Sequence, residues 1–127
     1  MIVACDRDEA KNNELIQELL KRENRPDGIF ASVEKLAIST YKICEELQLN
    51  IPKDVKVITF SNSYTAAFLN PSLTTVTQPA YEMGREAAAI LFKLIEKKKH
   101  HSAPESIVLN SRLIVGNSTK GERNMES

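Results

Sequence analysis

The sequence predicts an α/β fold, with a mainly parallel sheet and helices on both faces of that sheet. Short apolar runs typical of strands alternate along the chain with longer segments of helical period. The resulting order of strand, helix, strand, helix and strand is that of βαβ units, which place their strands in parallel. A length of 127 residues allows one domain of ordinary size or a piece of a larger one.

The first third of the chain predicts a strand, a helix and a second strand. Residues 2–4 (IVA) form a short run typical of a strand. Asp6 and Glu9 stand three residues apart and predict a capping box that opens a helix. The turn at residues 25–28 ends this helix, and residues 28–31 (GIFA) predict the next strand. One face of the helix is apolar and contains Leu15, Ile16, Leu19 and Leu20.

The middle of the chain predicts a second helix and a third strand. The helix runs from about Glu34 to Leu47, and Ile38 lies outside its apolar stripe. Pro52 and Asp54 mark a loop before the strand at residues 55–60, and an irregular stretch then reaches residue 71. The apolar stripe consists of Val33, Leu36, Ala37, Thr40, Tyr41, Ile43, Cys44 and Leu47.

The last part predicts a strand at residues 74–76, a helix from about Ala80 to Lys97, and two short apolar runs at 107–109 and 113–115. Apolar residues cover about half of this helix's circumference or more, which is wider than one sheet face can bury. We therefore expect the helix to pack on a second copy of the chain or against its own sheet. The apolar residues are Tyr81, Met83, Ala87, Ala88, Ile90, Leu91, Phe92, Leu94 and Ile95.

Composition excludes several classes of function. Seventeen Lys and Arg balance seventeen Asp and Glu, so this chain is not expected to grip nucleic-acid phosphates by itself. The sequence contains no apolar run long enough to cross a bilayer and no signal-peptide core, so the chain is expected to be cytoplasmic with no membrane partner. Cys5 and Cys44 are far apart and are interpreted as reduced packing residues.

No motif indicates an enzyme. Four glycines form neither of the two glycine-rich phosphate-binding motifs, and no nucleophile elbow occurs. His100 and His101 are adjacent in a charged loop and lack the spacing of metal ligands. The lysines at 97–99 are explained by the negative end of the preceding helix. We therefore expect no catalytic residue, no cofactor and no metal site.

Three consecutive motifs carry a resemblance to a known family. They are residues 25–31 (RPDGIFA), 51–58 (IPKDVKVI) and 71–79 (PSLTTVTQP), the last running on to Met83-Gly84. In sequence, order and spacing the chain resembles the LacI/GalR family of bacterial transcription regulators. The similarity covers residues 3–118, and the segment at 71–79 is its most specific part.

The resemblance implies one lobe and the last crossover of a type I periplasmic-binding-protein-like sensor domain. Residues 119–127 are then expected to be a flexible tail, and the helix-turn-helix and first lobe to be absent from this sequence. Such regulators are homodimers that bind a small metabolite, here sugar-like, in the cleft between two lobes. Operator DNA would be contacted only through the missing N-terminal domain, and lobe movement would couple the two sites.

A second function of the same fold stays open from the sequence. A lobe of a periplasmic solute-binding protein for sugar uptake would share this architecture and never touch DNA. The motifs at 51–58 and 71–79 resemble the regulators more closely. Upstream sequence separates the two, because a basic helix-turn-helix supports the regulator and a cleavable signal peptide supports the transport component.

The resemblance also places candidate ligand-binding residues, with departures from the family pattern. Val33-Glu34 replaces the usual Asn-Asp, and Thr59-Phe60-Ser61-Asn62 replaces Gly-Phe-Asp-Asp, so a ligand-facing carboxylate becomes a neutral serine. Each candidate keeps a plainer alternative: turn chemistry, a helix cap, an exposed helix start, or scaffolding at the crossover. The candidates are Ser61, Asn62, Glu34, Arg7 and Gln78.

The subunit interface implied by the resemblance uses the second helix and the loop after the third strand. Ile38 lies beyond the buried stripe of that helix and Tyr41 lies at its margin. Large apolar groups left at a surface commonly mark a contact. The candidate interface residues are Ile38, Tyr41, Tyr64 and Phe68.

Overall fold

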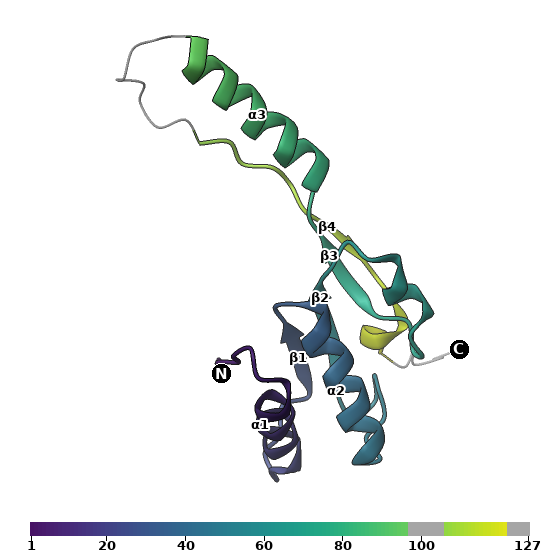
Figure 1. Cartoon of the computed structure of the whole chain (residues 1–127). Coiled ribbons are helices and arrows are strands. Elements are labelled where there is room, and N and C mark those ends of the chain that lie inside the picture. The colour runs from purple at the N-terminus through teal and green to yellow at the C-terminus, as the bar shows by residue number, and fades with distance from the viewer. Residues whose placement is uncertain (97–105, 122–127) are drawn as a thin grey trace, which may run out of the picture.

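A four-stranded sheet forms the centre of the protein, as Figure 1 shows for the computed structural model. The structure describes residues 1–96 and 106–121. Three neighbouring strands are parallel, and the fourth pairs antiparallel with the third. In spatial order the strands are β1 (Gly28–Ala31), β2 (Lys56–Phe60), β3 (Thr74–Thr77) and β4 (Arg112–Ile114).

The parallel register brings the carboxyl ends of β1, β2 and β3 to one edge of the sheet. Ala31 lies opposite Thr59, and Phe60 lies opposite Val76. The loops after these strands therefore begin side by side, and we call residues 32–34, 61–63 and 77–78, which lie at these strand ends, the carboxyl edge. Open α/β sheets bind ligands at this end of their strands.

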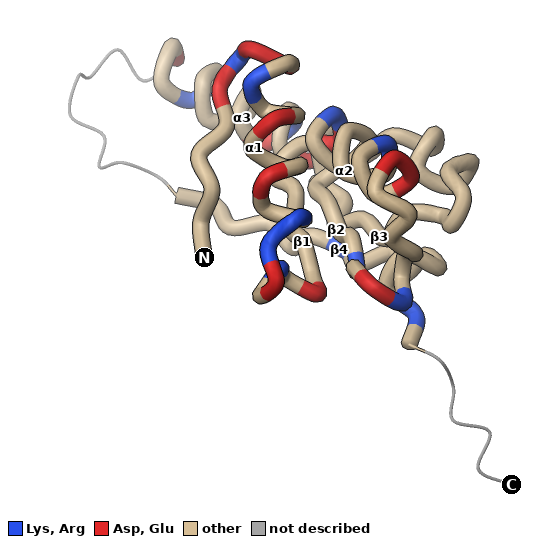
Figure 2. Tube along the Cα trace, turned by 90° about the horizontal axis from the view of Figure 1, so that it is seen from below, with Lys and Arg blue, Asp and Glu red and all other residues tan. Residues whose placement is uncertain are grey.

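Two helices cover one face of the sheet. α1 (Glu9–Lys21) packs on α2 (Glu34–Glu46), which in turn contacts β1 and β2, and Figure 2 shows both helices on the same side of the strands. Alternate residues of each strand enter this layer, because successive strand side chains point to opposite faces. The buried apolar core consists of Ile16, Leu20, Ala31, Ala37, Ile43, Cys44, Val55, Val57, Ala66 and Leu73.

The opposite face of the sheet is apolar and partly open. Phe30 and Phe60 stack edge to face there, with ring centroids 5.4 Å apart, yet Phe30 is 54% exposed. The predicted mainly parallel sheet with helices is confirmed, whereas in the described residues α1 and α2 cover one face of the sheet and not both. The stripe of α2 and the exclusion of Ile38 from it are also confirmed, although Val33 of that stripe is exposed.

The N-terminal segment differs from expectation. Residues 2–4 form no strand and Ile2 is 98% exposed, because no strand of the described residues lies beside them. The N-cap of α1 is Asp8, whose carboxylate accepts from the amides of Ala10 and Lys11. Asp6 instead accepts from the Asp8 amide at 2.7 Å, so the predicted capping box is wrong by two residues.

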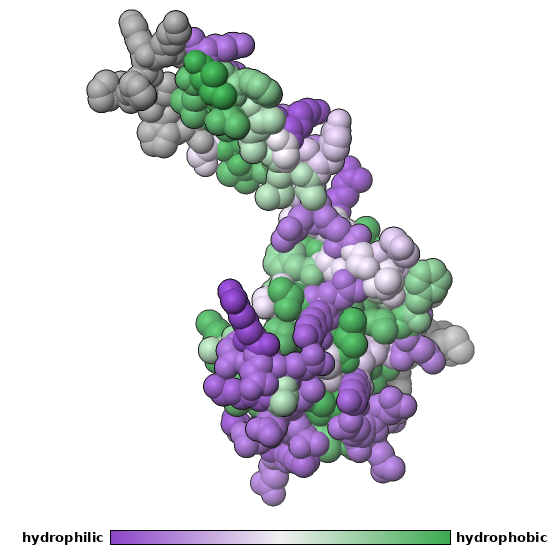
Figure 3. All heavy atoms as spheres, in the orientation of Figure 1, coloured by the Kyte–Doolittle hydropathy of each residue, from purple (hydrophilic) through white to green (hydrophobic). Residues whose placement is uncertain are grey.

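α3 (Ala80–Glu96) extends away from the sheet and has no buried residue. Figure 3 shows its apolar surface, on which Met83, Leu91 and Leu94 are each about half exposed. The expected return onto its own sheet is wrong for the single chain, because two residues separate α3 from β3 and direct it past the sheet edge. Packing on a second copy stays a prediction. In the described residues, no helix is long and apolar enough to cross a membrane.

The C-terminal return locks β3 to β2. Residues 107–109 form no strand, and only the second apolar run pairs, as β4. The buried Ser118 hydroxyl donates to the Val57 carbonyl (2.6 Å) and accepts from the Thr74 amide (2.8 Å). Two short 3₁₀ helices, η1 (Tyr64–Phe68) and η2 (Asn117–Thr119), follow β2 and β4 in the chain. The Thr119 hydroxyl lies 2.7 Å from that of Thr74, so the fold extends into the expected tail.

Candidate functional site

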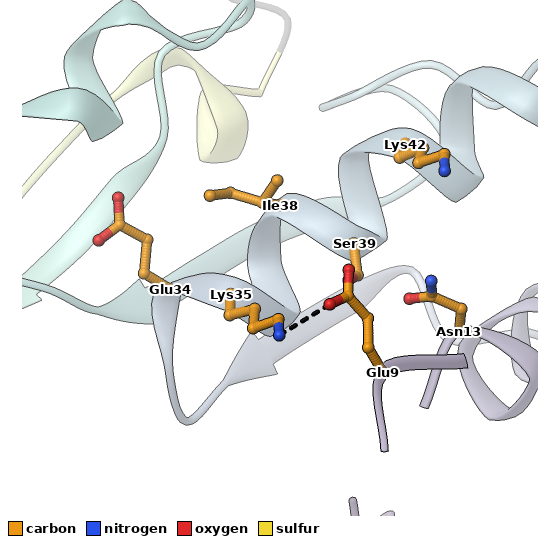
Figure 4. Close-up of a pocket in the computed structure, with 7 residues that line it drawn as sticks. All are labelled: Glu9, Asn13, Glu34, Lys35, Ile38, Ser39 and Lys42. Carbon is orange, nitrogen blue, oxygen red and sulfur yellow. Dashed lines mark ion pairs between the residues drawn. The ribbon is translucent and has the colours of Figure 1, made fainter. Parts of the chain in front are cut away.

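Glu34 is the central charged group of the carboxyl edge. Its two carboxylate oxygens accept hydrogen bonds from the hydroxyls of Thr65 (2.6 Å) and Ser61 (2.8 Å). These bonds, that of Thr65 foremost, lower the pKa of the Glu34 carboxyl below its usual range. In Figure 4 the Glu34 side chain points away from Lys35 and Glu9, towards the neighbouring loop. Glu34 is the first residue of α2, and its carboxylate binds side chains that follow β2.

The two departures from the family pattern meet at the carboxyl edge. Ser61 stands where the resemblance expects a carboxylate, and the Glu34 carboxylate lies within hydrogen-bond distance of its hydroxyl. The Ser61 oxygen also accepts from the Ser63 amide at 2.9 Å, which closes the loop into a tight turn. The carboxylate at position 61 is absent, as the sequence predicted, and the edge carries the carboxylate of Glu34, at the position where the pattern has Asp.

Thr65 is a site residue that the sequence analysis missed. It lies 31 positions from Glu34, and its hydroxyl makes the shorter of the two bonds to that carboxylate. The Ser63 hydroxyl lies 2.6 Å from it and extends the network. The spacing Ser61-x-Ser63-x-Thr65 places hydroxyls at alternate positions after a strand, which is the available signal in the sequence.

Asn62 and Gln78 meet at the same edge, the first through its side chain and the second through its backbone. The Asn62 side-chain amide donates to the Gln78 carbonyl (2.8 Å) and accepts from the Gln78 amide (2.7 Å). Both bonds fall on the backbone of the crossover from β3 to α3. These bonds agree with the scaffolding role expected as the alternative for Gln78, which here acts through its backbone.

Arg7 lies in a neighbouring hollow of about 410 Å³ beside the carboxyl end of β1. The hollow is formed by the N-terminal segment, the start of α1 and the loop into α2, and it includes Asp6, Ser32 and Val33. The structure thus gathers Glu34, Ser61, Asn62 and Gln78 along one edge and places Arg7 at its side.

A second hollow, of about 350 Å³, lies between α1 and α2 (Figure 4). Lys35 and Glu9 form an ion pair of 2.7 Å across it, and both side chains are more than half exposed. Exposed pairs of this kind contribute little. We attribute this hollow to the junction of the two helices.

The four candidate interface residues fall into two groups. Ile38 is 47% exposed, and Tyr64 and Phe68 of η1 are 81% and 82% exposed. Tyr41 is half-buried and its hydroxyl donates to the Pro71 carbonyl at 2.9 Å. Burial raises the pKa of the Tyr41 phenol. Tyr41 thus supports the fold, whereas the other three offer apolar surface.

Charge and metal-ligand chemistry add no further site in the part of the chain that the structure describes. No group of three His, Cys, Asp or Glu side chains could hold a metal ion there. His100, His101 and the lysines at 97–99 lie outside the described residues. Basic and acidic residues are interspersed along α1 and α2 (Figure 2), in keeping with a net charge of zero.

Known proteins match this chain over nearly its whole length. Residues 2–119 match the family described as Periplasmic binding protein-like domain. The transcriptional regulator RegA of Clostridium acetobutylicum is 34% identical over 107 residues, which are 83% of this chain and 30% of RegA. The ribose operon repressor of Halalkalibacterium halodurans is 32% identical over 100% of this chain and 38% of its own. The chain therefore spans about a third of the length of these relatives.

Solved structures of transcription regulators superpose on this chain. The transcriptional regulator CelR in complex with cellobiose superposes with a TM-score of 0.76 at 28% identity, over 89% of this chain and 34% of that chain. A LacI family regulator from Enterococcus faecalis V583 with bound ribose gives a TM-score of 0.75 at 28% identity, over 92% and 42%. The chain belongs to the periplasmic binding protein-like domain family, and its relatives are LacI-family transcription regulators.

Proposed function

We propose that this chain is the effector-sensing and dimerising part of a cytoplasmic, DNA-binding transcription regulator. Its carboxyl edge would form one wall of a cleft that binds a small, sugar-like metabolite. Operator DNA would be bound by a separate N-terminal domain. The observation that carries the proposal is the carboxylate of Glu34, held at the carboxyl edge next to the crossover.

The chemistry of Glu34 supports a hydroxylated ligand. A carboxylate accepts hydrogen bonds and makes charge-assisted bonds to hydroxyl donors. Glu34 already accepts from two hydroxyls, those of Thr65 and Ser61. A polyol would offer the same donors, and Ser61 would rotate to bond a ligand oxygen.

The other edge residues have distinct proposed roles. Arg7, beside the end of β1, would supply donors from the flank of the cleft. Asn62 and Gln78 would contribute on the crossover side, where they are already joined. No part of this function needs a catalytic residue, a cofactor or a metal. The regulators among the relatives favour this proposal over a solute-binding transport component.

Dimerisation is proposed to use the surface of Ile38, Tyr64 and Phe68. These side chains come from α2 and η1, which lie next to each other through the bond between Glu34 and Thr65. Tyr41 would support this surface from beneath through its bond to the Pro71 carbonyl. A homodimer formed here would leave the carboxyl edge open to an effector.

Titration of the isotopically labelled chain with ribose and with cellobiose tests the effector site. Binding by one lobe is expected to be weak, with amide resonance changes at 32–34, 61–63 and 78. Glu34→Ala should abolish these changes, and Glu14→Ala, which alters an exposed residue of α1, should leave them intact. Changes confined to the hollow between α1 and α2, or none up to millimolar sugar, would contradict the proposal.

A DNA-binding measurement tests the assignment of DNA contact to another domain. The isolated chain has no net charge and no basic face among its described residues, so it should not bind a duplex specifically at physiological salt. Tight, sequence-dependent retention of a duplex by this chain would contradict the assignment of DNA binding to a separate domain.

A further inference from the structure

We propose that Asn62 is a positioning residue that joins the effector edge to the crossover helix α3. It would act through the backbone of Gln78 and would not need to touch the effector. The response of α3 to an effector rests on the proposed function, whereas the contact between Asn62 and Gln78 is present without any ligand.

The Asn62 side chain extends the sheet by imitating a strand residue. Backbone pairing of β2 with β3 ends where the Ser61 amide donates to the Val76 carbonyl at 3.2 Å. Two residues further along, Gln78 receives its partners from the Asn62 amide group, one to its carbonyl and one to its N–H. A primary amide offers a donor and an acceptor together, as a peptide group does. The crossover is thereby fixed up to Gln78.

The start of α3 depends directly on Gln78. The Gln78 carbonyl also accepts a hydrogen bond from the Ala80 amide at 2.8 Å. In the first turn of α3, the Met83 amide then donates to the Pro79 carbonyl. One carbonyl therefore receives both the Asn62 side chain and the first residue of α3. Because α3 buries none of its residues, we assign its direction relative to the sheet to this junction.

The same loop is held on its other side by the candidate effector site. Ser61 donates to Glu34, and the Ser63 amide donates to the Ser61 hydroxyl. An effector hydroxyl that takes the place of the Ser61 hydroxyl on the Glu34 carboxylate would release Ser61. Release of Ser61 loosens the loop that presents Asn62, and the change reaches Gln78 and α3. A ligand can shift a structure only through such differential contacts.

Amide exchange and residual dipolar couplings of the labelled chain test the contact. In Asn62→Ala, exchange of the Gln78 amide should rise about tenfold relative to that of Val57, since each lost hydrogen bond is worth roughly one power of ten. The couplings of α3 should lose their fixed relation to those of the sheet. The matched control is Asn24→Ala, in the exposed turn before β1, which should change neither.

Asn62→Asp provides a milder variant. It keeps the acceptor for the Gln78 N–H and removes the donor to the Gln78 carbonyl, so protection of Gln78 should be largely kept while the couplings of α3 weaken. It decides the question if Asn62→Ala does not fold. Equal acceleration at Gln78 and Val57 in Asn62→Ala, or couplings of α3 unchanged in either variant, would overturn the proposal.

Sugar titration distinguishes the positioning role of Asn62 from the proposed effector site. In the wild type, ribose or cellobiose should shift resonances at 61–63 and then at 78 and in α3. In Asn62→Ala, any shift that the sugar still causes at residues 32–34 should no longer be accompanied by a response of α3. A response of α3 that survives in this variant refutes the positioning role, whereas sugar that shifts no edge residue in the wild type refutes the effector site and leaves the exchange result to stand alone.

Discussion

Replacement of Ser118 by alanine should destabilise the protein more than any other removal of one hydroxyl. Ser118 is fully buried, and its hydroxyl bonds the Val57 carbonyl at 2.6 Å and the Thr74 amide at 2.8 Å. Alanine fits the space but leaves both backbone groups without this partner. Each such group costs about 1–3 kcal/mol, so a loss of about 2–6 kcal/mol is expected. That is a large part of the roughly 5–15 kcal/mol typical of a domain.

Urea unfolding followed by circular dichroism measures this loss. Ser111→Ala is the matched control, since Ser111 is exposed just before β4, and its effect should stay within about 0.5 kcal/mol. The denaturant slope should be the same in both variants. If Ser118→Ala unfolds with the same midpoint as Ser111→Ala, then Ser118 does not lock β3 to β2 and the reasoning fails.

Three further predictions follow from other contacts. Gly116→Ala should cost about 2 kcal/mol or more in urea unfolding, because its Cβ would lie 2.7 Å from the Leu73 carbonyl carbon, whereas Gly84→Ala meets nothing and should raise the helicity of α3. The pKa of Glu34 is lowered in the folded state, so its stabilisation is present above its unfolded pKa and is lost as pH falls through the folded value. Glu34→Gln should therefore differ from wild type in unfolding free energy at neutral pH, and this difference should shrink below about pH 4.5; a constant difference argues against the network. Ile38→Glu with Phe68→Glu should shift the chain towards monomer in sedimentation, and an unchanged mass distribution argues against the interface.

Local sequence was sufficient for the order and type of most elements. α2 and α3 follow from apolar residues at helical spacing, and β1 and β2 follow from short apolar runs bounded by turn residues. These signals act over a few residues, so no tertiary information is needed to read them. The predicted capping box was wrong because Asp6 and Asp8 both stand before α1, and only side-chain geometry selects Asp8.

The sequence named four candidate residues of the carboxyl edge and none of the contacts between them. Sequence placed Glu34, Ser61, Asn62 and Gln78 after strand ends, and the parallel register brought them to one edge. The bonds from Glu34 to Ser61 and Thr65 join positions 27 and 31 residues apart. Periodicity carries no information about such pairs, because they depend on how strands align and which rotamers meet.

The sequence by itself determined the α/β class and the order of most elements, because hydrophobic spacing fixes which segments become helices or strands. Only the tertiary structure decided that residues 2–4 pair with no described strand, that α3 leaves its own sheet, and that a side-chain amide at Asn62 completes the pairing of β2 with β3. A strand needs a neighbour and a helix needs a surface. Whether these are present is a property of the folded arrangement and not of the segment itself.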